Sequence, residues 1–288
     1  MNNPYFIKEP AAISFSGGRT SAYMLWKVLQ AHGGTLPDHI KVVFANTGKE
    51  MPETLDFVRD CGEQWGVEIH WIELCKIIDI TGQDGYAKNA KWNRVYKRVD
   101  YASASRKGEP FNIMLETMDA IPNAVQRTCT ATLKVRGIRQ YLQSLGYQSP
   151  WTQFIGIRGD EKRRAVKLHG KRDEGMDCYL PLWLDGITKE DVGSFWSKQN
   201  FDLNLPNNNG VTDWGNCDLC HLKGRSKRMS IIRERPDLAD WWIEAERKKK
   251  QFFRPDELSY ANMKLIATDQ GNLFDFGDDE SIPCFCGD

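Results

Sequence analysis

A run of small, hydroxyl and guanidinium side chains near the start of the 288-residue chain has the make-up of an anion pocket, and it reads Ser16, Gly17, Gly18, Arg19, Thr20 and Ser21. Glycines without a Cβ let backbone N–H groups approach an oxygen cage closely, and the hydroxyls and the guanidinium add further donors. A Ser-Gly-Gly tripeptide is also an ordinary tight turn. The apolar residues after it recur at helical spacing, however, and the positive end of a helix dipole attracts anions. We therefore expect a phosphate-binding loop at the start of a helix.

The elements that must position this loop alternate between strand and helix. Buried strands are expected at 12–15, 40–45, 67–72 and 152–157, and helices directly after the loop, at 52–65 and from about 130 to 145. This alternation predicts a parallel sheet with helices on both faces, in which ligands bind beyond the carboxyl ends of the strands. A second glycine turn, Asn46-Thr47-Gly48, follows the second strand. It is expected to face the same crevice as the first loop.

Four motifs resemble those of the phosphoadenosine phosphosulfate (PAPS) reductase branch of the adenine-nucleotide α-hydrolase superfamily. The first loop resembles the pyrophosphate (PP) loop, Ser-Gly-Gly-x-Asp-Ser, with Thr20 in the place of Asp. Asn46-Thr47-Gly48 before Pro52-Glu53-Thr54 is similar to a second family turn, and residues 156–164 to a Gly-x-Arg-x-Asp-Glu-x-x-Arg stretch. With a late strand and a helix that Thr188 is expected to cap and that runs to Gln199, the resemblance covers about residues 11 to 200. It implies a Rossmann-like (HUP-type) α/β fold.

The resemblance also implies which residues bind the nucleotide and its phosphates: Ser14, Ser16, Gly17, Gly18, Arg19, Thr20, Ser21, Asn46, Thr47, Gly48, Gly156, Arg158 and Arg164. Of these, Arg158 and Arg164 would hold anionic groups of the substrate. Catalytic roles are expected for Arg19, Cys129 and Arg158. The alternative to a functional role is that these arginines belong to a solvated, salt-bridged surface.

Two reactions are compatible with this resemblance. In one, the loop grips ATP, with Mg²⁺ as a possible companion, and a substrate oxygen attacks the α-phosphorus; a sulfur donor then displaces the adenylate. In the other, a nucleophilic thiolate attacks the phosphosulfate of PAPS, and a thiol reductant is the partner. The reductases carry a Glu-Cys-Gly-Leu-His-type nucleophile near the C-terminus, which residues 284–287 match only at Cys-Gly. Nucleic acid is a further candidate acceptor.

Eight cysteines in a chain without a secretory signal indicate reduced thiols, metal ligands or catalysis rather than disulfides. Cys217-x-x-Cys220 has the spacing of a chelate, and His221 beside it is a further ligand for zinc. Four thiolates would suit a [4Fe–4S] cluster or zinc, and they are expected from Cys129, Cys217, Cys220 and Cys286, or Cys284 in its place. The resemblance favours iron and sulfur, because relatives in sulfate reduction and in DNA phosphorothioation carry such clusters.

The chain is expected to divide into a nucleotide-binding α/β domain, residues 1–200, and a cysteine-containing, metal-binding appendage of helices and loops, residues 201–288. Within the first, residues 75–110 are basic and tyrosine-rich and are interpreted as an insert. It is either a solvated surface or a lid that binds polyanions through side chains such as Tyr96. Three cysteines in periodic segments are expected in the core: Cys61, Cys75 and Cys178.

Overall charge leaves the partner open, because Lys plus Arg and Asp plus Glu number 39 each. A rival interpretation is a non-enzymatic module that binds nucleotide or nucleic acid, in which a zinc knuckle organises a basic surface of Lys223, Arg225, Lys227 and Arg228. No apolar run approaches the length of a membrane span, and the first ten residues are mixed polar. We therefore expect a cytoplasmic protein with no membrane partner.

Overall fold

Eight strands form one sheet in the computed structural model, which describes residues 3–76, 85–89, 94–173, 175–207 and 212–269. The strand order is β4-β5-β3-β2-β1-β6-β8-β7. The middle of the sheet is parallel and consists of β1 Ala11–Phe15, β2 Ile40–Ala45, β3 Ile69–Lys76, β6 Trp151–Ile155 and β8 Met176–Tyr179. The predicted α/β fold with a parallel sheet is thus confirmed.

The strand order reverses at β1, which lies between β2 and β6. Ile13 of β1 is opposite Val42 on one side and opposite Phe154 on the other. The chain first adds β2 and β3 on one side of β1 and then crosses to β6 and β8 on the other. In an open parallel sheet, this reversal separates the loops at the carboxyl ends of the two central strands and leaves room for a ligand. The loops after β1 and β6 therefore border the expected site.

The edges of the sheet are antiparallel. β5 Arg94–Val99 pairs with β3, and β4 Gly85–Asn89 pairs with β5, whereas β7 Arg172–Asp173 pairs with β8. Tyr96 of β5 is buried, and its hydroxyl donates to the Thr132 carbonyl oxygen. Tyr96 is therefore a core residue and not part of a surface strip, because β5 extends the sheet. The lid interpretation falls partly on residues 77–84 and 90–93, which lie outside the described residues.

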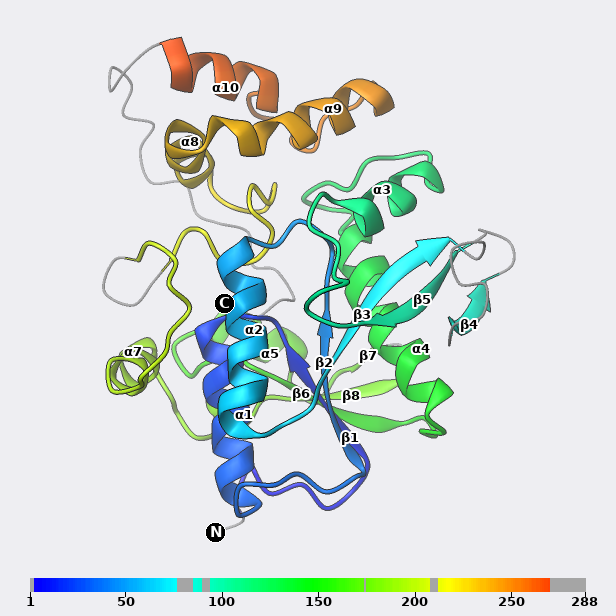
Figure 1. Ribbon diagram of the computed structural model, residues 1–288, viewed down its shortest axis with the longest axis vertical. Helices are drawn as coiled ribbons and strands as arrows, with labels where there is room; N and C mark the ends of the chain where they lie inside the picture. The colour runs from blue at the N-terminus through cyan, green and yellow to red at the C-terminus, as the bar shows by residue number, and fades with distance from the viewer. Residues whose placement is uncertain (1–2, 77–84, 90–93, 174, 208–211, 270–288) are drawn as a thin grey trace.

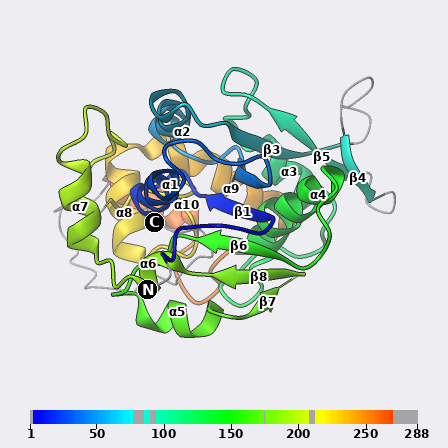
Figure 2. The ribbon, with the colours of Figure 1, turned by 90° about the horizontal axis from the view of Figure 1, so that it is seen from below.

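Helices cover both faces of the sheet. Figure 2 shows α1 Arg19–Ala31 and α2 Pro52–Trp65 on one side, and α4 Arg136–Ser144 on the other. This follows from right-handed crossovers, because the chain moves across the sheet in opposite directions before and after β3. A π-helical stretch, η3 Thr130–Val135, leads directly into α4. The shorter helices are α3 Glu109–Glu116, α5 Lys162–Leu168, α6 Pro181–Leu184 and α7 Lys189–Trp196.

The C-terminal helices form a layer above the carboxyl ends of β2 and β3 (Figure 1). They are α8 Arg225–Glu234, the 3₁₀ turn η4 Pro236–Leu238, α9 Ala239–Lys249 and α10 Tyr260–Asp269. Trp242 packs against Phe253 and Tyr260, with ring centroids 4.9 and 5.2 Å apart. The apolar core of the sheet continues without a break into this layer. The C-terminal layer is therefore placed where it can shape the ligand crevice.

Candidate functional site

The loop between β1 and α1 has a shape that only glycine accommodates at position 17. The φ angle of Gly17 is +81°, and a Cβ placed there would lie 2.6 Å from Cγ2 of Thr54. Any other residue would strain the backbone and press on α2. Gly18 is the N-cap of α1 and offers no capping side chain. The amino end of the 13-residue helix α1 thus lies at the carboxyl edge of the sheet, an arrangement that attracts phosphate.

Two serines close this loop on itself. The Ser21 hydroxyl donates to the Gly18 carbonyl oxygen at 2.9 Å and accepts from the Ser16 backbone N–H at 3.1 Å. The Ser16 and Ser21 hydroxyl oxygens are 2.9 Å apart. Beneath the loop, the Ser14 hydroxyl oxygen accepts from the side-chain amide of Gln153 on β6. The hydroxyls therefore shape the loop, and their predicted contact with a nucleotide stays a prediction.

The loop after β6 meets this first loop at the reversal point. A Cβ on Gly156 would lie 3.0 Å from Cα of Ser21, so only a residue without a side chain lets β6 approach α1 this closely. Nη1 of Arg158 donates to the Thr20 hydroxyl oxygen at 3.1 Å. The structure thus brings together two motifs that lie more than a hundred residues apart in the chain. A guanidinium and the amino end of α1 share one small region.

Glu161 engages both arginines that were predicted to bind the substrate. Its Oε2 accepts from the Arg158 backbone N–H at 3.0 Å, and its Oε1 accepts from Nη1 of Arg164. Nε of Arg158 also donates to Asp160 at 3.0 Å. An incoming phosphate would share these guanidiniums with the Glu161 carboxylate. The anion-binding role of the two arginines remains a prediction.

Arg19 has a partner outside the loop. Its Nε and Nη2 donate to the two carboxylate oxygens of Asp202 at 2.7 and 2.5 Å, and its backbone oxygen accepts from Nε1 of Trp196 at 3.0 Å. This bidentate pair ties the first turn of α1 to the segment after α7. The pairing gives Arg19 a structural role, and its catalytic role stays a prediction.

The Asn46-Thr47-Gly48 turn follows β2 and is buried. Nδ2 of Asn46 donates to Oε1 of Glu73 at 2.5 Å and to the Ser105 carbonyl oxygen at 2.8 Å, and Oδ1 accepts from the Gly48 backbone N–H at 3.0 Å. Burial raises the pKa of Glu73, and the hydrogen bonds from Ser105 and Asn46 oppose that rise. The polar atoms of Asn46 thus fix the turn from inside the protein. Sequence reasoning found the turn but missed Glu73.

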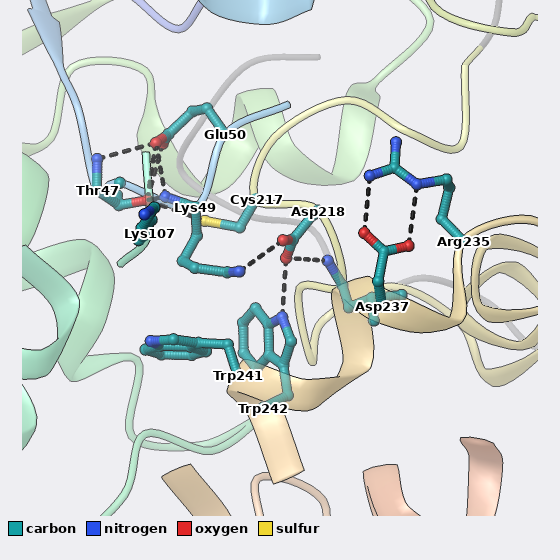
Figure 3. Close-up of polar contacts among 12 residues, drawn as sticks. Thr47, Lys49, Glu50, Lys107, Cys217, Asp218, Arg235, Asp237, Trp241 and Trp242 are labelled. Atoms are coloured by element: carbon teal, nitrogen blue, oxygen red, sulfur yellow. Dashed lines mark hydrogen bonds and ion pairs between the residues drawn. The ribbon is translucent and has the colours of Figure 1, made fainter. Parts of the chain in front are cut away.

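Glu50 clamps the same turn (Figure 3). Its carboxylate accepts from the backbone N–H of Thr47 at 3.0 Å and from the Thr47 hydroxyl at 2.9 Å, and it lies 3.9 Å from Nζ of Lys134. Cys217 Sγ is 3.5 Å from the same hydroxyl. Burial, and then the Glu50 carboxylate, raise the pKa of the Cys217 thiol, while Lys134 opposes them. The predicted cysteine turn and the second predicted loop are therefore in direct contact.

A buried ion pair joins the C-terminal layer to this turn. Nζ of Lys49 is 2.7 Å from Oδ2 of Asp218, and the two side chains are 7% and 5% exposed. Oδ1 of Asp218 accepts from Nε1 of Trp242 at 2.8 Å, and Lys49 Nζ lies 5.1 Å from the Trp241 ring centroid (Figure 3). Sequence reasoning missed both charges. The available signal was an aspartate inside the Cys-x-x-Cys turn.

Cys217 and Cys220 are both buried, and Cys129 is half-buried directly before η3. Within the described ranges, no three His, Cys, Asp or Glu side chains are arranged to hold a metal ion. Cys284 and Cys286 lie outside the described residues. Two thiols of the predicted four-thiolate centre therefore share one turn, and the complete centre stays a prediction.

The remaining cysteines and His221 are buried. Burial in the core is confirmed for Cys61, Cys75 and Cys178. His221 stacks on Phe253 with ring centroids 5.3 Å apart, and its pKa is lowered to about 3, first by burial and then by Arg228. The His221 imidazole is therefore neutral at physiological pH.

The predicted basic surface after the cysteine turn is wrong for two of its residues. Lys223 is buried, and its Nζ donates to the Asp218 carbonyl oxygen at 2.8 Å. Arg228 is fully buried, and its guanidinium donates to Glu257. Both side chains hold the C-terminal layer together, so they do not present charge to a partner.

Along the described ranges, no helix is both long and apolar enough to cross a membrane.

The chain is similar to one family model and to two uncharacterized proteins over most of its length. The family model of the phosphoadenosine phosphosulfate reductase domain matches residues 10–204. The uncharacterized nin region protein ORF290 of Escherichia phage lambda is 31% identical over 215 residues, which are 75% of this chain and 67% of that protein. The uncharacterized protein MJ0066 of Methanocaldococcus jannaschii is 27% identical over 242 residues, which are 82% of this chain but only 41% of that protein.

Two solved structures have limited similarity to the chain. A PAPS reductase from Candida auris in a phosphate complex has a TM-score of 0.39 at 15% identity, over 66% of this chain and 73% of that one. The U34-tRNA thiolase NcsA from Methanococcus maripaludis with its [4Fe–4S] cluster has a TM-score of 0.36 at 14% identity, over 84% and 74% of the two chains. Because the family model covers more than half of its residues, this chain belongs to the PAPS reductase domain family.

Proposed function

We propose that this chain is a cytoplasmic enzyme that binds an adenine nucleotide, ATP or PAPS, at the loop between β1 and α1 and carries out sulfur chemistry on it. Membership of the PAPS reductase domain family supports the nucleotide class. No disulfide joins any of the six described cysteines, which suits a reducing compartment.

One observation carries the proposal: the β1–α1 loop and the β6 loop converge at the point where the strand order reverses. A side chain at Gly156 would press on Ser21 and block this approach, whereas one at Gly17 would press on Thr54 of α2 and distort the first loop. The amino end of α1 and the Arg158 guanidinium, which contacts Thr20, are the positive groups of the region. Backbone N–H groups at a helix start combined with a guanidinium form a site for a phosphate or a phosphosulfate.

Two reactions fit this site. With ATP, a substrate oxygen attacks the α-phosphorus, the bond to pyrophosphate breaks, and a sulfur donor then expels AMP from the adenylate. With PAPS, a thiolate attacks the sulfur of the phosphosulfate and expels adenosine 3′,5′-bisphosphate; a second thiol, from the reductant, then releases sulfite and leaves a disulfide. In both, Arg158 and the amino end of α1 would stabilise the negative charge of the leaving phosphate. Among the described cysteines, Cys129 alone is not fully buried, so it is the thiol that we assign to the attack on PAPS.

The proposed cofactor is a [4Fe–4S] cluster, with zinc as the alternative. Its support from the described residues is the pair Cys217 and Cys220 on one buried turn next to Thr47. Because two thiols do not make a closed site, Cys129 and a tail cysteine would have to complete it. Cys129 would then be a ligand of the centre in an enzyme that uses ATP, and not the nucleophile of the PAPS reaction. Such a centre would lie against the Asn46-Thr47-Gly48 turn rather than in a separate module.

Replacing Arg158 with alanine tests the nucleotide site. A charge-assisted hydrogen bond contributes about 1.5–3 kcal/mol, so we expect the Kd for the bound nucleotide to rise at least about tenfold. Arg164→Ala should act in the same direction. ATP, AMP and PAPS are titrated separately by calorimetry against each purified variant, which also identifies the preferred nucleotide.

Arg172→Ala is the matched control, since Arg172 is an exposed arginine that pairs with Asp177 on a strand edge. It should leave nucleotide affinity unchanged. Thermal melting without ligand separates lost binding from lost folding. Equal affinities for the Arg158→Ala variant and the unaltered protein, with both folded, would show that the loops do not form the nucleotide site.

A further inference from the structure

A short helix beside the proposed nucleotide site exposes a row of cations. α5 begins four residues after Arg158, and its sequence from Lys162 to Leu168 contains no acidic residue. Exposed basic side chains continue beyond the helix into β7. We call this surface the α5 strip, and it consists of Lys162, Arg163, Lys167, Lys171 and Arg172.

Aromatic side chains lie next to these cations. The exposed His169 follows α5 directly, and its ring centroid is 4.9 Å from that of Trp183, which is only partly buried. Val166, between the strip's cations on α5, is 76% exposed. Cations interleaved with exposed ring faces are the pattern of surfaces that bind single-stranded nucleic acid, because phosphates contact the cations and bases stack on the rings.

The strip leads into the region of the β1–α1 loop. Arg158, in the loop between β6 and α5, donates to Thr20 in the first turn of α1. Arg164 of α5 and Arg158 share the carboxylate of Glu161, so α5 is held against the Arg158 loop. Figure 2 shows α5 beside β7 and β8, at the sheet edge opposite β4. A single-stranded nucleic acid that lies on α5 would therefore end next to the proposed nucleotide site.

Several basic side chains of the C-terminal layer have partners within the protein. Lys223 and Arg228 are buried, and Lys227 pairs with Asp213 at 2.9 Å. On α9, Arg247 and Lys248 both pair with Glu244. In the α5 strip, Arg172 pairs with Asp177, and the side chains of Lys162, Lys167 and Lys171 are exposed.

We propose that the α5 strip binds a single-stranded stretch of nucleic acid and holds it beside the β1–α1 loop. The backbone phosphates lie along the cations, and a base stacks on the Trp183 and His169 rings. This makes nucleic acid the macromolecular substrate class of the proposed enzyme, and to that extent the inference rests on the proposed function. The binding surface itself depends only on exposed charge and on the rings of His169 and Trp183.

The test is fluorescence anisotropy with a labelled 20-nucleotide RNA of mixed sequence and with the DNA of the same sequence, over a range of salt concentrations. The variant carries Lys162→Gln, Lys167→Gln and Lys171→Gln. For single strands, each lost phosphate contact makes the negative slope of log K against log salt shallower by about 0.7. The loss of three contacts should therefore reduce the size of the slope by about 2 and weaken binding about 100-fold at 0.1 M salt. Trp183→Leu should weaken binding with the salt slope unchanged.

The control variant carries Lys198→Gln, Lys248→Gln and Lys250→Gln, which removes the same charge from exposed positions on other elements. It should bind like the unaltered protein. Equal losses in the two triple variants, or no binding of either strand by the unaltered protein, would overturn the proposal. The RNA and DNA arms show which strand is preferred.

Nucleotide affinity is measured in parallel to keep the two proposals apart. The α5 variant should bind ATP or PAPS as the unaltered protein does. Nucleotide binding without oligonucleotide binding would refute the proposal for the α5 strip and leave the proposed function standing. Oligonucleotide binding that depends on the α5 strip, in a protein that binds no nucleotide, would refute the proposed function and leave the proposal for the strip standing.

Discussion

Asp218→Asn should weaken the attachment of the C-terminal layer to the turn after β2. The substitution keeps the volume of the side chain and an acceptor for Nε1 of Trp242 and for the Leu219 backbone N–H, which lies 2.6 Å from Oδ1. It removes the charge opposite Lys49, whose side chain is only 7% exposed. An uncompensated charge left in such a place costs about 3–5 kcal/mol. We expect the free energy of unfolding to fall by about that amount.

Urea denaturation followed by circular dichroism measures this loss, and limited proteolysis reports whether the residues after Cys217 become accessible. The matched control is Asp240→Asn, because Asp240 pairs with Lys264 at 2.5 Å in an exposed setting, with 65% and 30% of the two side chains exposed. A surface pair of this kind contributes at most about 1 kcal/mol. Adding Lys49→Met to Asp218→Asn should restore part of the stability, since the stranded charge is then gone.

The reasoning fails if Asp218→Asn costs no more than Asp240→Asn. It also fails if the losses of Lys49→Met and Asp218→Asn simply add in the double variant. Either result would mean that water reaches the pair, so that its burial does not control its energy.

Three further predictions concern the loop, a buried histidine and the cysteine turn. Gly17→Ala should lower the melting temperature more than Gly33→Ala. Both sites have a positive φ, of +81° and +70°, but only at Gly17 would the new Cβ meet another residue. Equal losses of melting temperature would show that Thr54 moves away from the new Cβ without cost. Burial lowers the pKa of His70 from 6.5 to about 4, so the folded state binds its proton later than the unfolded chain as the pH falls. Stability should therefore be lost between pH 6.5 and 4 by up to about 1.4 kcal/mol per unit from this group, and His70→Gln should flatten that slope in pH-dependent urea titrations. Cys217→Ser should abolish the iron or zinc content after anaerobic isolation. Cys61→Ser, on the buried face of α2, should retain it. An unaltered protein that contains neither metal would refute the proposed centre.

The local features of this protein were predictable from short stretches of sequence, because each depends on residues close in the chain. Two glycines after an apolar run predicted the β1–α1 loop, and Pro52 predicted the first turn of α2. Thr188 was predicted to cap a helix, and it does so with Asp191 in a reciprocal capping box, although α7 ends at Trp196 rather than near residue 199. Helix ends depend on contacts outside the helix, which explains this error.

The residues around the predicted site were decided by tertiary structure, because their partners come from distant parts of the chain. Arg19 reads as a phosphate ligand in the sequence, yet its guanidinium binds Asp202. Tyr96 lies in a basic, loosely patterned segment, and only its pairing beside β3 shows that it belongs to the core. Lys49 and Asp218 look like ordinary surface charges until the C-terminal layer folds over β2. Periodicity and turn chemistry are written along the chain, whereas burial of a charge depends on which segments the fold brings together.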